Sequence, residues 1–178
     1  MEYLFSSSIK FRQKELVKGQ STQPSFKRWE PFRSFIGGLI AISCLGILSN
    51  LSNYSLLIAP FGASTVLLFG VPNSPLAQPR NLILGNFTGA ISAVLCVFFL
   101  GSSPLSSGIA VGLAIALGQA LRCLHPPAGA VALLGVLLKA SPTFILIPVL
   151  SGSLILLGIA LVFHRFQRRE QSYPLHWL

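Results

Sequence analysis

The sequence predicts an all-α, polytopic helical membrane protein. Hydrophobic residues make up 52% of the 178 residues and charged residues only 10%, whereas an ordinary soluble domain carries about 25% charged residues. No Asp or Glu lies between Pro31 and Arg169, and the net charge of +9 is concentrated near the two ends of the chain. Basic ends that flank an apolar middle are typical of a membrane protein whose termini face the cytoplasm.

The apolar middle divides into long and short segments. A helix needs about 20 apolar residues to cross about 30 Å of hydrocarbon, and four segments approach or exceed that length: residues 34–51, 81–100, 105–121 and 142–163. Two further segments, 54–71 and 126–138, are interrupted by Pro and Gly or are too short. We therefore predict six membrane helices in which helices 2 and 5 are the short Pro-Gly segments. Four full spans are the alternative, if these two are re-entrant.

The same pattern divides the chain into three regions. We predict a basic cytoplasmic N-terminal tail (1–33), a transmembrane domain (34–163) and a basic cytoplasmic C-terminal tail (164–178). No apolar stretch directly follows the N-terminus, so no cleavable secretory signal is predicted. With both termini inside, six crossings place Arg80 on the cytoplasmic side and Lys139 outside. His164 and His176 accompany the C-terminal charges, and we expect both to be exposed to solvent.

A shift of the sequence by 67 residues brings parts of it into register with itself. Residues 60–63 (PFGA) fall on 127–130 (PAGA), and Gly85 falls on Gly152. Chance matching is the alternative, because Gly, Ala and Leu are common in this chain. A true repeat would place three crossings in each half, so the halves would have opposite orientations. Paired interrupted helices in corresponding halves indicate the binding site of a transporter.

The tripeptide His125-Pro126-Pro127 is the most unusual feature of the sequence. Proline fits the first turn of a helix but not its middle, so one helix should end near Leu124 and another should begin at one of the prolines. A helix that begins below the membrane surface has N–H groups in need of partners. Its positive end and these donors favour an anion.

The candidate substrate-binding residues gather around the two Pro-Gly segments. They are His125, Arg122, Pro127, Gly129, Ala130, Gly62, Ala63, Ser64 and Asn86. The glycines would let a ligand or another helix approach the backbone closely. His125 either contacts substrate or supports the helix break, and Arg122 either binds an anion or extends its side chain to the membrane surface. No cofactor and no metal site is predicted, and an enzyme is not expected because Asp is absent from the chain.

Three motifs of this sequence resemble those of the HPP family of integral membrane proteins, which is named for the His-Pro-Pro tripeptide. The motifs are residues 59–64 (APFGAS), 79–81 (PRN) with Gly85, and 125–130 (HPPAGA), and the resemblance covers residues 31–163. It implies nitrite transport in a cyanobacterial plasma membrane or a plastid envelope. Members of the family are usually described with four transmembrane helices, whereas we predict six.

The predicted function is therefore a transmembrane transporter or channel for a small monovalent anion, nitrite first, with the ion near two helix starts at mid-membrane. The alternative is a non-transporting structural or assembly subunit of a membrane complex. The lipid bilayer is the expected environment. Patterns of small residues such as Gly108-Ile-Ala-Val-Gly112 favour close helix packing, within the chain or in a homo-oligomer. Nucleic acid is not an expected partner.

Overall fold

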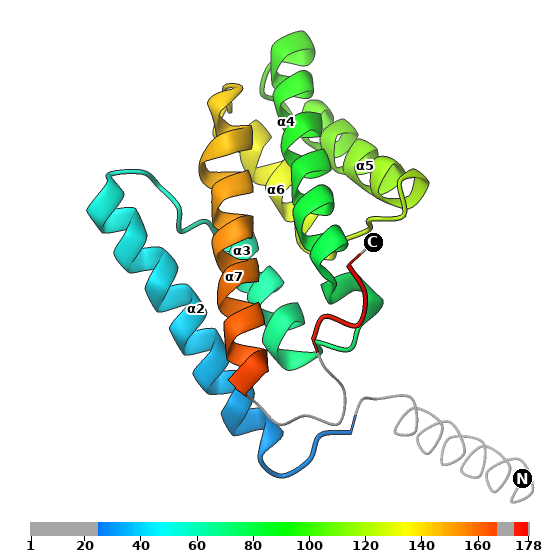
Figure 1. Cartoon of the computed structure of the whole chain (residues 1–178). Helices are drawn as coiled ribbons and strands as arrows, with labels where there is room; N and C mark the ends of the chain where they lie inside the picture. The colour runs from blue at the N-terminus through cyan, green and yellow to red at the C-terminus, as the bar shows by residue number, and fades with distance from the viewer. Residues whose placement is uncertain (1–24, 167–172, 178) are drawn as a thin grey trace, which may run out of the picture. The chain divides into compact units, whose positions relative to one another are not determined.

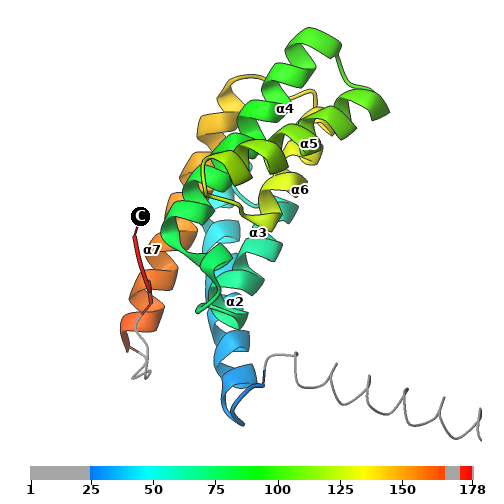
Figure 2. The same ribbon diagram turned by 90° about the vertical axis from the view of Figure 1, so that its right-hand side faces the viewer.

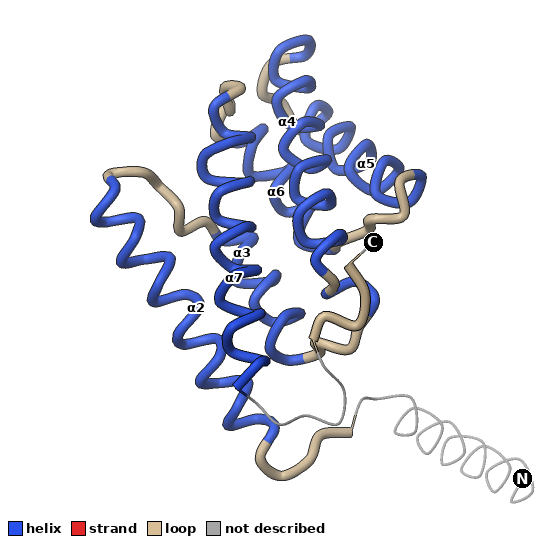
Figure 3. The backbone as a smooth tube through the Cα atoms, viewed as in Figure 1, coloured by secondary structure: helices blue, strands red, loops and turns tan. Residues whose placement is uncertain are grey.

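The computed structural model describes residues 25–166 and 173–177, so most of the predicted N-terminal tail and part of the C-terminal tail lie outside it. The chain divides into two units, residues 1–31 and 32–178, and nearly all of the described helical residues belong to the second. The described residues form helices and loops and no strand (Figure 3). The predicted all-α class is confirmed.

Six helices follow one another along the described chain, and three of them include π-helical segments (η). The order is α2 (Glu30–Ser52), α3 (Ala59–Thr65) continued by η1 (Val66–Gly70), the short 3₁₀ turn η2 (Pro75–Ala77), η3 (Asn81–Gly85) continued by α4 (Asn86–Leu100), α5 (Pro104–Ala120), α6 (Pro126–Leu137), and η4 (Ile145–Leu150) continued by α7 (Ser151–Phe166).

Local sequence explains where α5 begins and ends. Ser103 and Ser106 form a reciprocal capping box, with Pro104 in the first turn, so the first free N–H groups are satisfied. At the other end Arg122 adopts a positive φ of 53°, and the N–H of Cys123 donates to the carbonyl oxygen of Gly118 at 2.8 Å. This is the left-handed termination that closes many helices.

Three helices are long and apolar enough to cross a membrane: Glu30–Ser52, Asn81–Leu100 and Ile145–Phe166. The shorter apolar helices are Ala59–Gly70, Pro104–Ala120 and Pro126–Leu137. The 17 residues of α5 span about 25 Å as a helix. The two shortest helices are those that the sequence predicts as Pro-Gly segments, and the predicted number of six helices is confirmed.

Consecutive helices alternate in direction. In Figure 1, α2, α4 and α6 run upward and α3, α5 and α7 run downward. Figures 1 and 2 place α2 and α3 toward one end of the bundle and α4, α5 and α6 toward the other, with α7 running along both. α4 packs on α5 and α6, and α7 contacts α3. Helices at corresponding positions in the two halves of the chain therefore point in opposite directions.

The helices pack through small side chains and expose large ones. The core between α4, α5 and α6 is built from Ala93, Cys96, Ala110, Ala114, Ala132 and Val136. Gly89 of α4 lies directly against the carbonyl oxygen of Ala128, so the lack of a side chain at this position serves close packing within the chain. Large apolar side chains face outward, and Phe98 is 78% exposed. Such a surface fits a lipid environment rather than water.

The expectation of an exposed His164 is wrong. His164 is 4% exposed, and its Nε2 donates a 2.9 Å hydrogen bond to the carbonyl oxygen of Leu68. Its ring also stacks on Phe69 at 5.7 Å between ring centroids. The cause is that α7 continues to Phe166, so its last turn packs on η1 and does not extend into solvent. His176 is exposed, as predicted.

Candidate functional site

The two short helices begin in the same way. Ile58 precedes α3 and His125 precedes α6, both in extended conformation and both followed by proline within the first two helical positions. The apolar helices Ala59–Gly70 and Pro126–Leu137 have matching bounds under the 67-residue shift that the sequence suggested. Because proline fixes φ and cannot sit deeper in a helix, it sets both starting points.

Burial repeats with the same spacing. Every residue from 58 to 69 has the burial class of its counterpart from 125 to 136. Pro60 and Pro127 are both buried, Gly62 and Gly129 are both half-buried, and the alanines that follow them are both exposed. Most of the paired residues differ in type, so similar side chains do not explain the shared burial pattern. The pattern instead indicates that the two helices pack in similar surroundings.

The short helices lie against each other and run in opposite directions. α3 and α6 contact each other, and in Figure 1 α3 runs downward from the middle of the bundle while α6 runs upward from it. The start of each helix is therefore inside the bundle. A membrane orientation that follows the long helices would place both starts away from the two surfaces.

His125 joins α6 to two other segments. Its ring is 2% exposed. Nδ1 lies 2.9 Å from the carbonyl oxygen of Leu76, which only accepts, so Nδ1 carries the hydrogen. In the neutral ring Nε2 then accepts from the hydroxyl of Ser64 at 2.9 Å. Both ring nitrogens are engaged, and an anion would have to displace Ser64 to reach Nε2.

Two side chains at the start of η3 form hydrogen bonds with the segment between α5 and α6. Arg80 donates from Nη2 to the carbonyl oxygen of Leu121 at 2.9 Å, and Asn81 donates from Nδ2 to that of Leu124 at 2.7 Å. The first bond places a positive charge at the C-terminal end of α5, where it is favourable. These two side chains satisfy carbonyl groups that the interrupted helix leaves free.

The start of α6 offers fewer N–H donors than the sequence suggested. Pro126 and Pro127 have no N–H, and the N–H of Ala128 donates to the carbonyl oxygen of His125 at 2.8 Å. In α3 the N–H of Phe61 donates to Ile58 in the same way. The positive end of the helix dipole remains, but prolines remove most of the donors that would bind an anion directly.

Asn86 makes a buried contact with a residue that the sequence analysis did not single out. Its Nδ2 donates a 3.0 Å hydrogen bond to Oγ of Ser153, and both residues are fully buried. Oδ1 of Asn86 is buried without a hydrogen-bond partner among the described residues, an arrangement that costs about 1–3 kcal/mol. The 67-residue shift suggested by the sequence pairs Asn86 with Ser153, so that predicted register was the signal that could have found Ser153.

The remaining predicted residues lie at the edges of this arrangement. Gly129 and Ala130 line an open pocket of about 630 Å³, together with His125 and with Val111 and Ile115 of α5. Gly62 and Ala63 lie at the corresponding positions of α3, and a Cβ added at Gly62 would meet no atom within 4 Å.

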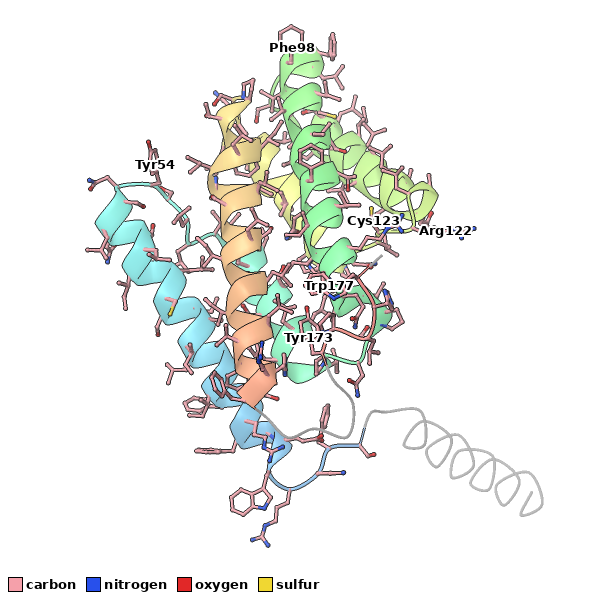
Figure 4. The ribbon with its side chains drawn as sticks, viewed as in Figure 1. Tyr54, Phe98, Arg122, Cys123, Tyr173 and Trp177 are labelled. Atoms are coloured by element: carbon pink, nitrogen blue, oxygen red, sulfur yellow. The ribbon has the colours of Figure 1, made fainter. Side chains whose placement is uncertain are left out.

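Arg122 stands apart from the other predicted residues. Its side chain is exposed and points away from the helices in Figure 4. The structure therefore brings His125 together with Ser64 and not with Arg122. Among the described residues no group of His, Cys, Asp or Glu is arranged to hold a metal ion.

The fold and this site define an integral membrane protein of packed helices, two of them short and begun by proline inside the bundle. Comparison with known proteins gives the family. The family model described as HPP, transmembrane region, matches residues 23–174, and the chain belongs to the HPP family.

Two curated relatives are similar over most of the chain. Both are from Dictyostelium discoideum and both are named only as transmembrane proteins. One is 38% identical, with 95% of this chain and 64% of the relative covered. The other is 37% identical, with 84% of this chain and 50% of the relative covered. The chain thus spans between half and two thirds of the length of these relatives. No solved structure matches the chain.

Proposed function

We propose that this protein carries a small monovalent anion, nitrite first, across the membrane past the starts of α3 and α6. The observation that carries the proposal is the pairing of the two short helices, which contact each other and begin inside the bundle from opposite directions (Figure 1). In several transporter folds the substrate binds where two such interrupted helices meet.

The charge distribution selects an anion. No acidic residue lies between Pro31 and Arg169, so no negative side chain repels an anion within the helical bundle. Both short helices direct the positive ends of their dipoles toward its interior. A cation pathway would normally use Asp or Glu at membrane depth. The choice of nitrite rests on the family resemblance, as does localisation in a cyanobacterial plasma membrane, to which relatives from Dictyostelium add no support.

The site residues take different parts in this proposal. Gly129 and Ala130 leave room for an ion beside the start of α6, where the pocket lies, and Gly62 and Ala63 do the same beside α3. His125 and Ser64 are positioning residues, because their hydrogen bond joins the two helices. Arg122, exposed at the end of α5, attracts anions to the surface rather than binding them inside.

Flux of nitrite in proteoliposomes tests the proposal. The full chain is purified, reconstituted, and compared with protein-free vesicles under a nitrite gradient, with a pH gradient imposed in either direction. We expect nitrite to enter the vesicles faster when the protein is present. A subunit that only assembles a larger complex would give no flux alone, so protein-free rates under both pH gradients would contradict the proposal.

A further inference from the structure

The contact between Asn86 and Ser153 joins corresponding residues of the two halves. The hydrogen bond links positions that are 67 residues apart, and the same spacing separates the matching helices Ala59–Gly70 and Pro126–Leu137. When a two-fold axis relates two halves of a chain, a residue can touch its own counterpart only near that axis. The contact therefore lies where such an axis between the halves would pass.

The backbone is irregular on both sides of this contact. Asn86 follows directly on the π-helical segment η3, and Ser153 comes shortly after the π-helical segment η4. The crossing is reciprocal, because α4 packs on η4 and α7 packs on η3. π-helical turns inside α-helices occur most often at functional sites, and binding sites of transporters lie at the interface between repeats.

Only one end of the Asn86 side-chain amide is hydrogen-bonded. The amide is fully buried and its Oδ1 has no partner among the residues that the structure describes. A hydroxyl both donates and accepts. If the amide of Asn86 rotates about its Cβ–Cγ bond so that Oδ1 and Nδ2 exchange places, it therefore still bonds to Ser153. In the turned state Oδ1 accepts from the hydroxyl, and the two N–H groups of Nδ2 are free to donate.

The contact is close to the pocket beside α6. His125 lines that pocket, and a Cβ added at Gly85, the residue before Asn86, would lie 2.5 Å from Cβ of His125. Gly85 therefore packs directly on His125, and Asn86 follows a residue that touches the pocket wall. An anion in this pocket reaches the amide only if α4 moves relative to α6 at this contact.

We propose that the amide of Asn86 is the group that binds the anion on the axis between the two halves, donating from Nδ2 while Ser153 holds Oδ1. This inference rests on the proposed function and names the residue that contacts the substrate. The anion accepts hydrogen bonds from Nδ2 of the rotated amide. After the anion leaves, the amide rotates back, and Nδ2 again donates to Ser153.

Substitutions at Asn86 test the assignment in proteoliposomes, with nitrite as the probe. Asn86→Leu keeps the branching of the side chain but is larger and has no hydrogen-bonding groups, and Asn86→Asp keeps the shape and adds a negative charge. The control is Ser92→Ala, which removes another buried hydroxyl of α4 whose recorded bond is to the carbonyl oxygen of Thr88. We expect nitrite flux to fall about 10-fold or more in both Asn86 variants and less than about 2-fold in the control.

A second measurement separates loss of binding from loss of folding. Nitrite should raise the melting temperature of the purified wild type and of Ser92→Ala, and it should leave that of Asn86→Leu unchanged. Wild-type flux in a folded Asn86→Leu variant would overturn this inference and leave the proposed function intact. If Asn86→Leu does not fold, wild-type flux in Asn86→Asp would overturn it. Absence of flux in the wild type would overturn the proposed function and this inference together.

Discussion

The hydroxyl of Ser64, in the last turn of α3, donates a hydrogen bond to Nε2 of His125, the residue that precedes α6. The ring's other nitrogen donates to the carbonyl oxygen of Leu76. A single buried imidazole therefore fixes the two short helices to each other and to η2, the short turn that follows the first of them. The tripeptide that marks the family supplies both this connection and the prolines that begin α6.

Removal of this connection should destabilise the fold. His125→Ala leaves the Ser64 hydroxyl and the Leu76 carbonyl oxygen without partners and opens a cavity, so we expect a loss of about 2–5 kcal/mol in the free energy of unfolding. Ser64→Ala should cost about 1 kcal/mol. Unfolding in mixed micelles measures both, together with the double variant. The double variant should cost less than the sum of the two, whereas strict additivity would show that the two residues do not interact.

Two glycines within helices, Gly89 of α4 and Gly62 of α3, should respond differently to substitution by alanine. A Cβ at Gly89 would collide with the carbonyl oxygen of Ala128, whereas one at Gly62 meets no atom within 4 Å. We expect Gly89→Ala to lower the free energy of unfolding by about 1–3 kcal/mol. Gly62→Ala should leave it unchanged or raise it by up to about 1 kcal/mol, because alanine favours a helix. Equal effects of the two substitutions on thermal stability in detergent would contradict the packing described here.

The alternation of helix directions predicts which loops share a side of the membrane. Ser102 and Lys139 are exposed in the turns before α5 and after α6, and Arg122 is exposed at the opposite end of α5. In a variant without Cys44, Cys96 and Cys123, we expect Ser102→Cys and Lys139→Cys to react with an impermeant thiol reagent from outside. Arg122→Cys should react from inside only. Reaction of positions 102 and 139 from opposite sides would exclude the six-segment arrangement.

Tyr173 should make stability depend on alkaline pH. Its hydroxyl donates to the carbonyl oxygen of Ala77 at 3.0 Å, and burial raises the pKa of this phenol well above its ordinary value of 10.0. The folded state therefore holds the proton more tightly than the unfolded state does. The resulting stability is fully present below about pH 10 and is lost as pH rises toward the raised pKa.

Tyr173→Phe is the control for that dependence. It removes the titrating group, so stability between about pH 10 and 11 should fall less steeply than in the wild type. At neutral pH it should cost about 1 kcal/mol, because the Ala77 carbonyl oxygen loses its partner. Melting curves of the wild type and Tyr173→Phe, recorded at neutral and at alkaline pH, measure the difference in stability. Parallel curves for the two proteins would remove Tyr173 from the account.

The sequence was sufficient for features that depend on local chemistry. Apolar length and the prolines at 60, 126 and 127 located the six helices and identified the two short ones, because proline has few permitted positions in a helix. The bounds of the two short helices, Ala59–Gly70 and Pro126–Leu137, differ by the predicted spacing of 67 residues, whereas a repeat of the whole half stays a prediction. His164 was misjudged because nearby charges suggested solvent, whereas α7 continues past Phe163 and buries the ring.

Contacts between distant segments were beyond the sequence. Nothing near His125 indicates Ser64 or Leu76 as its partners, since the pairing follows from how α3 and α6 cross. The charge rule placed Arg80 on the cytoplasmic side, but its bond to the Leu121 carbonyl oxygen depends on the position of η3. Ser153 is an exception, because it lies 67 residues after Asn86 and the predicted shift pairs the two.

A negative charge introduced at position 129 provides the most direct test of anion passage beside the helix starts. Gly129 has open space, with its nearest neighbour Val111 at 3.8 Å from an added Cβ, so Asn and Asp can replace it with equal shape. Nitrite flux in proteoliposomes is measured for the wild type, Gly129→Asn and Gly129→Asp. The account predicts that Gly129→Asp passes at least about 10-fold less nitrite than Gly129→Asn. Equal flux in these two folded variants would contradict passage of an anion at this place.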